Sequence, residues 1–455
     1  MKTLLLSMII LTSLAHGKEL SLADHNSIAS LKTLSHDQQV NVTDVELDHL
    51  GTVSLNLKRF KVFAEDAHVV IHGENGTSQQ AMPDNAYFTG TIQGLNDSDV
   101  FIGFLESGEI FGFVKTAGQA TKELRQIQNN RFKLLTPDNY KSSIKDNREW
   151  NPKDYLELPD DIIEQRQQNT VQGLSAIDYQ LTLAIETDFE FYKKFNNSTA
   201  ATNYISSLIG YISSIYYSEI KTYILLGQVD IWTQNNDPWN ATSSQCALYE
   251  VGRFWNNNRQ NVNRAITHFM SGKNFGGGIA WLGVLCQGPF NYDISSAGCP
   301  GLTPTTSNYG GGYGVTGSLS GSFNPGNPQI GWDLLGISHE IGHNFNSHHT
   351  HCYGGVEGNA NPVDECYGTE NNCYSGPISL PGPAGQGSGT IMSYCHLLNG
   401  GMNNITLTFG KNHNYGVQPQ RVPNKMRAHV ESRASSQPQC IMPAASDLIF
   451  MNGFE

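Results

Sequence analysis

The chain has 455 residues, which is too long for one ordinary domain and suits two or three. Its composition is that of a folded globular protein, with 38% hydrophobic and 10% aromatic residues. The formal net charge of −13 gives no basic surface of the kind that binds phosphates, so nucleic acid is excluded as the expected partner.

The first residues have the pattern of a secretory signal peptide over residues 1–17. An apolar run from Leu4 to Leu14 follows an early lysine, and the small residues Ala15 and Gly17 fit a signal-peptidase site. A buried N-terminal helix is the competing interpretation. No later segment reaches the roughly 20 apolar residues that cross a bilayer. We therefore expect a secreted protein, cleaved near Gly17, with no membrane span.

Residues 18–150 are predicted to form a β-rich domain. They contain no cysteine and are rich in short strand-like runs, such as residues 68–71. Residues 100–105 and 110–114 are separated by a short glycine-containing turn, which predicts a hairpin. Residues 151–174 are polar and include two prolines, so we interpret them as an exposed connector.

Residues 175–440 change to an alternation of strands and helices, which predicts an α/β domain. The final residues, 441–455, form a short C-terminal tail. The predicted elements in chain order are a strand at 179–185, helical segments at 188–217, a strand at 227–232, a helix at 253–269, a strand at 278–285 and a helix at 332–345.

Residues 339–349 have the spacing H-E-x-x-H-x-x-N-x-x-H. His339 and His343 are four residues apart on the last predicted helix and therefore face the same way. His349 can complete a trio around zinc if the chain reverses at Asn346, and asparagine tolerates the left-handed backbone that such a turn needs. Glu340 is then placed to take a proton from a water. The alternatives are that His339 and His343 are surface histidines and that Glu340 is an ordinary surface charge. The spacing of the whole motif favours a zinc peptidase.

The neighbouring His348 lies one residue away from the ligand spacing, and we expect it to face away from the metal. The eight cysteines all lie between Cys246 and Cys440. In an exported chain they predict up to four disulfides, whose pairing stays open. Cysteine ligation of zinc is the alternative, but no C-x-x-C pair occurs.

With Met392 inside the run from Thr390 to Tyr394, the histidine motif resembles the metzincin metallopeptidases. The local sequence His-Glu-Ile-Gly-His-Asn-Phe resembles the adamalysin/reprolysin branch, and the asparagine at 346 resembles the ADAM-TS group within it. Further resemblances are at residues 231–238 and 280–286 to the core and edge strands of that branch, at 85–113 to the reprolysin propeptide, and at 446–455 to a tail on exported bacterial proteins.

This resemblance implies a twisted mixed sheet with an active-site helix and a Met-turn, preceded by a β-rich propeptide domain. It implies that His339, His343 and His349 bind one zinc ion and that Glu340 is the general base. Met392 would lie in the Met-turn as a hydrophobic floor beneath the metal and would not be a ligand. The alternative is an ordinary core methionine, and the two interpretations nearly coincide.

Two further roles are implied beside the metal. Tyr394 is a candidate transition-state contact, although burial beside the Met-turn explains a tyrosine equally well. The predicted edge strand would bind substrate as an added antiparallel strand, with a plain edge strand as the alternative. Its residues are Ile279, Ala280, Trp281 and Leu282.

The chain also departs from the family pattern. Thr350 stands where the branch has an aspartate after the third histidine, which puts the local architecture in doubt. The propeptide-like region has no cysteine for a thiolate switch, and residues 150–175 have no basic run for a furin-like enzyme. Latency, if any, must come from a carboxylate, from steric cover or from nothing.

We expect a secreted zinc endopeptidase, made as a zymogen, that hydrolyses extracellular proteins or peptides through a zinc-activated water and Glu340. A monomer is expected. The alternative is a secreted binding or adhesion protein that keeps the zinc-bound scaffold without turnover, and a zinc hydrolase of non-peptide bonds is a weaker third. The sequence leaves open the natural substrate, a structural Ca²⁺ site and the site of activation.

Overall fold

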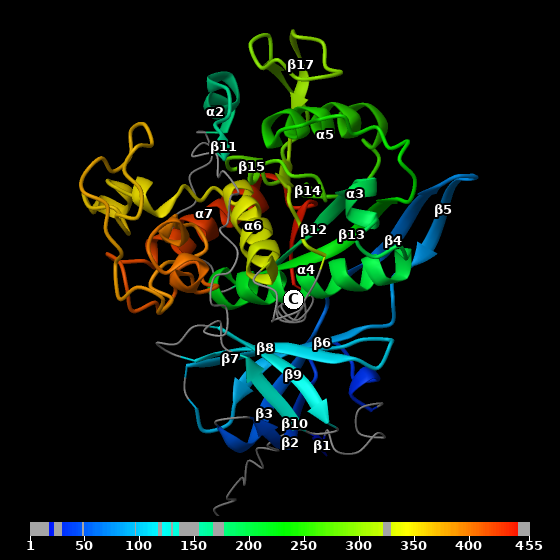
Figure 1. Cartoon of the computed structure of the whole chain (residues 1–455), viewed down its shortest axis with the longest axis vertical. Helices are drawn as coiled ribbons and strands as arrows, with labels where there is room; N and C mark the ends of the chain where they lie inside the picture. The colour runs from blue at the N-terminus through cyan, green and yellow to red at the C-terminus, as the bar shows by residue number, and fades with distance from the viewer. Residues whose placement is uncertain are drawn as a thin grey trace, which may run out of the picture.

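The computed structural model describes residues 18–21, 30–47, 50–95, 97–116, 121–128, 131–135, 154–166, 177–321 and 329–444. The predicted signal peptide and most of the predicted tail lie outside these residues. Figure 1 shows two bodies, with the long helix α4 (Ser198–Ile220) between them.

The lower body in Figure 1 is an 8-stranded sheet that closes on itself. Closure follows because β2 pairs with β3 along one edge and with β1 and β10 along the other. Alternate side chains fill the interior, as at Leu55, Phe88 and Ile102. The predicted hairpin is confirmed as β7 and β8. The strands are β1 (Lys18–Ser21), β2 (Gln39–Leu47), β3 (Gly51–Phe60), β6 (Ala86–Ile92), β7 (Ser98–Phe104), β8 (Ile110–Thr116), β9 (Lys122–Gln128) and β10 (Arg131–Leu135).

The upper body contains a 9-stranded mixed sheet with helices on both faces. Its central strands are parallel, and β15 runs antiparallel to β18. In order the strands are β11 (Tyr155–Leu156), β15 (Gly278–Trp281), β18 (Tyr313–Thr316), β14 (Ile266–Met270), β12 (Tyr179–Thr187), β13 (Thr222–Trp232), β4 (Phe63–Gly73) and β5 (Gly76–Ala81), with β19 (Ile441–Pro443) beside β12; β16 (Phe290–Asp293) pairs separately with β17 (Thr306–Gly310).

Helices α4 and α6 share one hydrophobic core on one face of this sheet, and α5 packs in another on the opposite face. The predicted α/β class and the β-rich N-terminal region are confirmed. The remaining helices are α2 (Asp160–Arg166), α3 (Phe189–Tyr192), α5 (Ser244–Asn258), α6 (Gln329–Asn344) and α7 (Arg421–Ser436), with short 3-10 turns at η2 (Thr350–Cys352), η3 (Val356–Gly358), η4 (Cys395–Leu397) and η5 (Gly401–Asn404).

The barrel and the upper body share α4. The side chain of Asn197 caps the start of this helix by accepting from the Ala200 amide at 2.9 Å. The helix is buried around most of its surface because the sheet covers one side and the barrel the other. The Tyr211 ring stacks on Phe113 of the barrel at 3.9 Å between centroids. The two bodies are therefore packed as one hydrophobic unit.

Strands β4 and β5 connect the two bodies in a second way. They belong to the predicted propeptide region, yet β4 pairs in parallel with β13 and extends the upper sheet (Figure 1). His72 on β4 stacks on Trp232 at 4.0 Å, and its Nε2 lies 2.7 Å from Asp230 Oδ1. The N-terminal region thus completes a sheet whose other strands come from residues after 150. The predicted domain boundaries stay a prediction.

Three local predictions are wrong. The strand predicted at 278–285 ends at Trp281. The helix predicted at 253–269 ends at Asn258, and residues 266–270 form the strand β14. These residues carry β-branched and aromatic side chains, and all five are buried between neighbouring strands, where a pleated chain packs best. The connector is not exposed at Asp154, which is buried by contacts far away in the sequence.

All eight cysteines are paired, so the predicted four disulfides are confirmed and cysteine ligation of a metal is wrong. Among the described residues, no helix is long and apolar enough to cross a membrane. The pairs are Cys246–Cys299, Cys286–Cys440, Cys352–Cys373 and Cys366–Cys395.

Candidate metal centre and active site

The turn after α6 has the backbone that the motif requires. Asn346 has a φ of 72°, which confirms the prediction of a left-handed residue at this position. Its amide donates to the His343 carbonyl at 2.8 Å, and the Ser347 amide donates to the Gly342 carbonyl at 3.0 Å. These bonds end the helix and direct the chain back towards His349.

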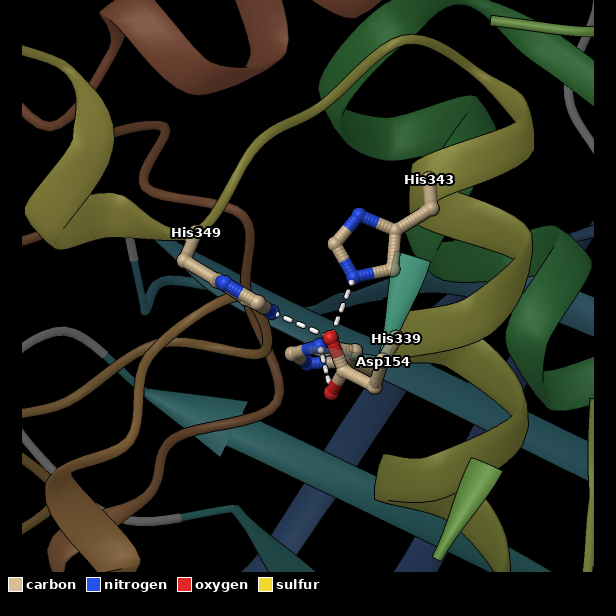
Figure 2. Close-up of side chains that lie close together, drawn as sticks. All are labelled: Asp154, His339, His343 and His349. Carbon is tan, nitrogen blue, oxygen red and sulfur yellow. Dashed lines mark hydrogen bonds and ion pairs between the residues drawn. The ribbon is translucent and has the colours of Figure 1, made fainter. Parts of the chain in front are cut away.

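The structure brings His339, His343 and His349 together, two from α6 and one from the loop beyond it (Figure 2). Each Nδ1 is held by an oxygen of the surrounding protein, which turns each Nε2 towards a common point. Where that oxygen is a backbone carbonyl, Nδ1 donates to it, and in the neutral ring Nε2 has its lone pair available for a metal. The contacts are His339 Nδ1 to Ile391 O, His343 Nδ1 to Ser347 O and His349 Nδ1 to Glu370 Oε2, each 2.7 Å long.

The carboxylate of Asp154 lies at the point where the three imidazoles meet (Figure 2). Its oxygens are 3.2 Å from His339 Nε2, 3.3 Å from His343 Nε2 and 2.6 Å from His349 Nε2. Burial opposes ionisation of Asp154, but the imidazoles of His349 and His339 outweigh burial and hold the pKa of the carboxyl group well below its usual range. A charged acid therefore occupies the centre of the site.

The donor set suits a zinc ion. The ligand atoms of the three histidines and Asp154 all lie within 4.8 Å of one another, and all four residues are buried. Catalytic zinc sites have three protein ligands and a fourth position for water or substrate. Here the fourth donor is a carboxylate from the chain itself.

Glu340 lies beside this cluster, next to the charge of Asp154. Its side chain is fully buried, and neither carboxylate oxygen has a partner in the described part of the chain. Burial raises its pKa well above the usual value, and the nearby charge of Asp154 adds to the shift. Gly278 makes room for it, because a Cβ there would lie 2.3 Å from Glu340 Oε1. Buried groups without partners are rare and mark functional positions.

Met392 lies under the histidine helix. It is fully buried, and its Sδ would lie 2.6 Å from a Cβ at Gly342, so only glycine lets the two segments approach this closely. The amide of Thr350 donates to the Met392 carbonyl at 3.0 Å. The Thr350 hydroxyl also lies beside the buried carboxyl group of Asp364, so this loop is ordered with threonine in the unusual position.

Tyr394 is fully buried next to the cluster. Its ring lies 4.5 Å from the His349 ring between centroids, and its hydroxyl interacts with the Asp154 carboxylate. Burial and the nearby carboxylate of Asp154 raise the pKa of Tyr394 well above its usual value. Its position fits a donor towards the centre of the site, and its transition-state role stays a prediction.

The predicted edge strand is covered by residues 154–156 of the same chain. Strand β11 pairs with β15 in parallel, opposite to the direction predicted for a substrate. The Ala280 amide donates to the Asp154 carbonyl and the Leu282 amide to the Leu156 carbonyl, both at 2.9 Å. Ile279 and Trp281 are buried on the strand, and the Trp281 ring packs towards α5 rather than into the cleft.

His348 lies outside the group of three histidines. Its Nδ1 contacts Lys425 Nζ, and its ring meets the edge of the Tyr155 ring at 5.6 Å between centroids. Burial, and then the positive charge of Lys425, lowers its pKa to about 3. A neutral imidazole therefore lies beside Tyr155, next to the three histidines.

Sequence reasoning missed Asp154, Tyr155 and Glu370. Asp154 and Tyr155 lie in a segment that reads as a polar connector, and Glu370 is one of several polar residues in a loop. The missing thiolate switch was the one signal that bears on Asp154, because it left a carboxylate, steric cover or nothing as the source of any latency.

Comparisons with known proteins agree with this geometry. Residues 178–406, about half of the chain, match the family model described as metallo-peptidase family M12, of the reprolysin type. The chain is similar to human disintegrin and metalloproteinase domain-containing protein 23, with 23% identity over 261 residues, covering 51% of this chain and 30% of that protein. A crystal structure of metalloproteinase-II from Bacteroides fragilis matches at 9% identity and a TM-score of 0.33, covering 73% of this chain and 88% of that one.

Proposed function

This chain belongs to metallo-peptidase family M12, and on that premise we propose that it is a secreted endopeptidase, made as a zymogen, that hydrolyses peptide bonds in extracellular proteins. As a reprolysin-type metzincin it is a zinc metallopeptidase. Its four disulfides fit an extracellular protein. The secreted, zymogenic enzyme with Glu340 as its base is our proposal.

His339, His343 and His349 would hold one zinc ion through their Nε2 atoms. When bound there, zinc would supply Lewis-acid polarisation of a water and of the scissile carbonyl. The three Nδ1 contacts support this assignment, because they fix the ring orientations before a metal binds. Met392 would keep the helix and the loop at the distance that the trio requires.

Glu340 would accept a proton from the attacking water and return it to the leaving amine. Its burial and its lack of partners in the described residues support this role, since its oxygens are free to bond a water. The raised pKa makes it a stronger base than an exposed glutamate. The Tyr394 hydroxyl would donate to the developing oxyanion from the position where it now meets Asp154.

Asp154 would keep the zymogen inactive. Its carboxylate fills the position where a water would be held, and residues 154–156 cover the backbone donors of the edge strand. The parallel direction of β11 supports inhibition rather than cleavage, because the peptide bonds run opposite to those of an antiparallel substrate strand. The single observation that carries the proposal is this Asp154 carboxylate among the three histidines.

The test is the Glu340→Gln variant of the activated enzyme in a casein digestion, with Glu190→Gln as the control. Glu190 lies on α3, and its ion pair with Lys193 is solvent-exposed. The Glu340 variant should bind one zinc per chain and lose peptidase activity by at least a hundredfold, as expected for loss of a general base. The control should match the wild type. Casein cleavage by the Glu340 variant at the wild-type rate would show that Glu340 is not the base, and no cleavage by the wild type would favour a binding protein without turnover.

A further inference from the structure

The side chain of Tyr155 fills a space between three imidazoles and the carboxylate of Glu370, and we call this space the pocket. Its ring faces the imidazoles of His343, His348 and His349, with centroids 4.8, 5.6 and 5.2 Å away. Its hydroxyl donates to Glu370 Oε1 at 3.0 Å. A tyrosine hydroxyl carries its proton at neutral pH, so Tyr155 is the donor and Glu370 the acceptor in this bond. The pocket therefore has ring-shaped walls and one acceptor at its end.

The two oxygens of Glu370 have different partners. Oε2 lies 2.7 Å from both His349 Nδ1 and His351 Nε2, which belong to the enzyme itself. In the described residues, Oε1 has the Tyr155 hydroxyl as its partner, and the side chain is only 6% exposed. When the covering segment leaves, Oε1 loses this bond and stays held in place. The loop that carries Glu370 is fixed by the disulfides Cys352–Cys373 and Cys366–Cys395.

The backbone of the edge strand sets which side chain enters this pocket. Tyr155 lies between the two hydrogen bonds that Ala280 and Leu282 donate to the covering segment. Side chains alternate between the two faces of a strand, whichever direction it runs. Tyr155 is the register partner of Ala280 and lies on the same face of the sheet. In an antiparallel substrate the residue paired directly with Ala280 lies on that face too, so its side chain would be presented to Glu370.

The charges around the pocket favour a neutral aromatic side chain over a cation. Lys425 Nζ contacts His348 in the pocket wall, and its positive charge would repel a lysine or arginine side chain. Glu370 Oε2 already shares its charge with two imidazoles. A flat ring fits against the imidazole walls, as the ring of Tyr155 does.

We propose that in the activated enzyme this pocket is a substrate subsite that selects tyrosine, with Glu370 Oε1 accepting the hydrogen bond of the substrate hydroxyl. The proposal rests on the peptidase function proposed above. A buried acceptor left without a partner disfavours phenylalanine, which has the same ring but no hydroxyl. The selected tyrosine would lie next to the scissile bond in the substrate. This follows because Tyr155 comes directly after Asp154, whose carboxylate lies among the three histidines.

The first test compares peptide substrates that differ only by tyrosine or phenylalanine at each position flanking the cleaved bond. At one position the activated enzyme should prefer tyrosine in kcat/KM by about ten- to a hundredfold, as expected for a hydrogen bond to a charged acceptor. In Glu370→Gln the ratio should fall to within about threefold. Because each ratio compares two peptides cleaved by the same variant, any effect of the substitution on His349 changes both kcat/KM values and cancels. Glu365→Gln, on the same loop but bonded to Ser379, should keep the wild-type ratio.

The second test measures binding without catalysis. A fluorescent peptide with the sequence of residues 154–166, and its counterpart with phenylalanine at 155, are titrated with activated Glu340→Gln enzyme by anisotropy. The tyrosine peptide should bind about tenfold or more tightly, and the added Glu370→Gln substitution should remove the difference. Equal rates and affinities for tyrosine and phenylalanine, or a preference for lysine or arginine, would overturn the subsite. If no peptide is cleaved, the peptidase function fails, while this binding difference still decides the pocket.

Discussion

The Asp154 carboxylate lies 2.6 Å from His349 Nε2, although the two residues are 195 positions apart in the chain. The same carboxylate meets His339 and His343, so one acid side chain covers all three nitrogens that would hold a metal. In the proposed zymogen, activation would have to move residue 154 before a substrate could approach the centre.

Replacing Asp154 should weaken latency. In Asp154→Ala the uncleaved chain should digest casein at least about tenfold faster than the uncleaved wild type, because the charged contacts that hold the segment are lost. Glu157→Gln, an exposed neighbour, should stay as inactive as the wild type. N-terminal sequencing checks that the assayed chains are uncleaved. An Asp154→Ala zymogen as inactive as the wild type, when both become active after cleavage, would assign latency to steric cover alone.

Metal removal should affect both activity and stability. A chelator should abolish casein digestion by the activated enzyme, and added zinc should restore it. A ligand that binds only the folded state at a thousand times its Kd stabilises that state by about 4 kcal/mol. The melting temperature should therefore fall on chelation in the wild type and change little in His343→Ala, which lacks one ligand. An unchanged melting temperature in the wild type would argue against a bound metal at the three histidines.

The close approach of Met392 to α6 depends on Gly342. A Cβ at this position would lie 2.6 Å from Met392 Sδ and 3.2 Å from Phe409, so Gly342→Ala should destabilise the fold by about 1–3 kcal/mol through overpacking. Zinc affinity should fall with it, since His339 and His343 flank the residue. Gly288→Ala is the matched control, because nothing lies within 4 Å of its added Cβ. Denaturant unfolding and zinc titration of both variants check this, and equal unfolding midpoints would contradict it.

His268 makes stability depend on pH. This residue of β14 is fully buried, and burial lowers its pKa from 6.5 to about 3. The unfolded chain then binds a proton that the folded chain does not, so the contribution of His268 is complete above pH 6.5 and is lost as pH falls towards 3. Between pH 6.5 and pH 5 this loss is about 2 kcal/mol. In His268→Gln, which keeps a side-chain partner for Thr316 but does not titrate, unfolding free energy should fall less over the same range. If the unfolding free energies of the wild type and the variant change in parallel with pH, His268 does not contribute to the pH dependence of stability.

The contact between β4 and β13 should outlast cleavage of the chain. After activation, the N-terminal region should remain bound to the catalytic region, because its strand β4 is part of the same sheet. His72→Ala removes the stacking on Trp232 and the bond to Asp230, at a cost of about 1–3 kcal/mol. Size-exclusion chromatography of cleaved protein should show one complex for the wild type and partial separation for the variant. Complete separation of the cleaved wild type would show that pairing with β13 does not hold the two parts together.

Much of the metal centre could be predicted from the sequence because its geometry is local. Residues four apart on a helix face the same way in any fold, and an asparagine at 346 can take the left-handed backbone wherever the helix ends. The α/β class followed from periodicity for the same reason. The helix predicted over 253–269 failed where burial between two strands outweighed the local pattern.

The sequence by itself thus determined the three histidines, the glutamate among them and the even set of cysteines. Only the tertiary structure decided that Asp154 enters the cluster, that Glu370 supports His349 and that β4 joins the second sheet. These contacts join segments separated by 195, 21 and 158 residues. No periodicity links such segments, because their approach depends on how the whole sheet and its disulfide-bonded loops pack.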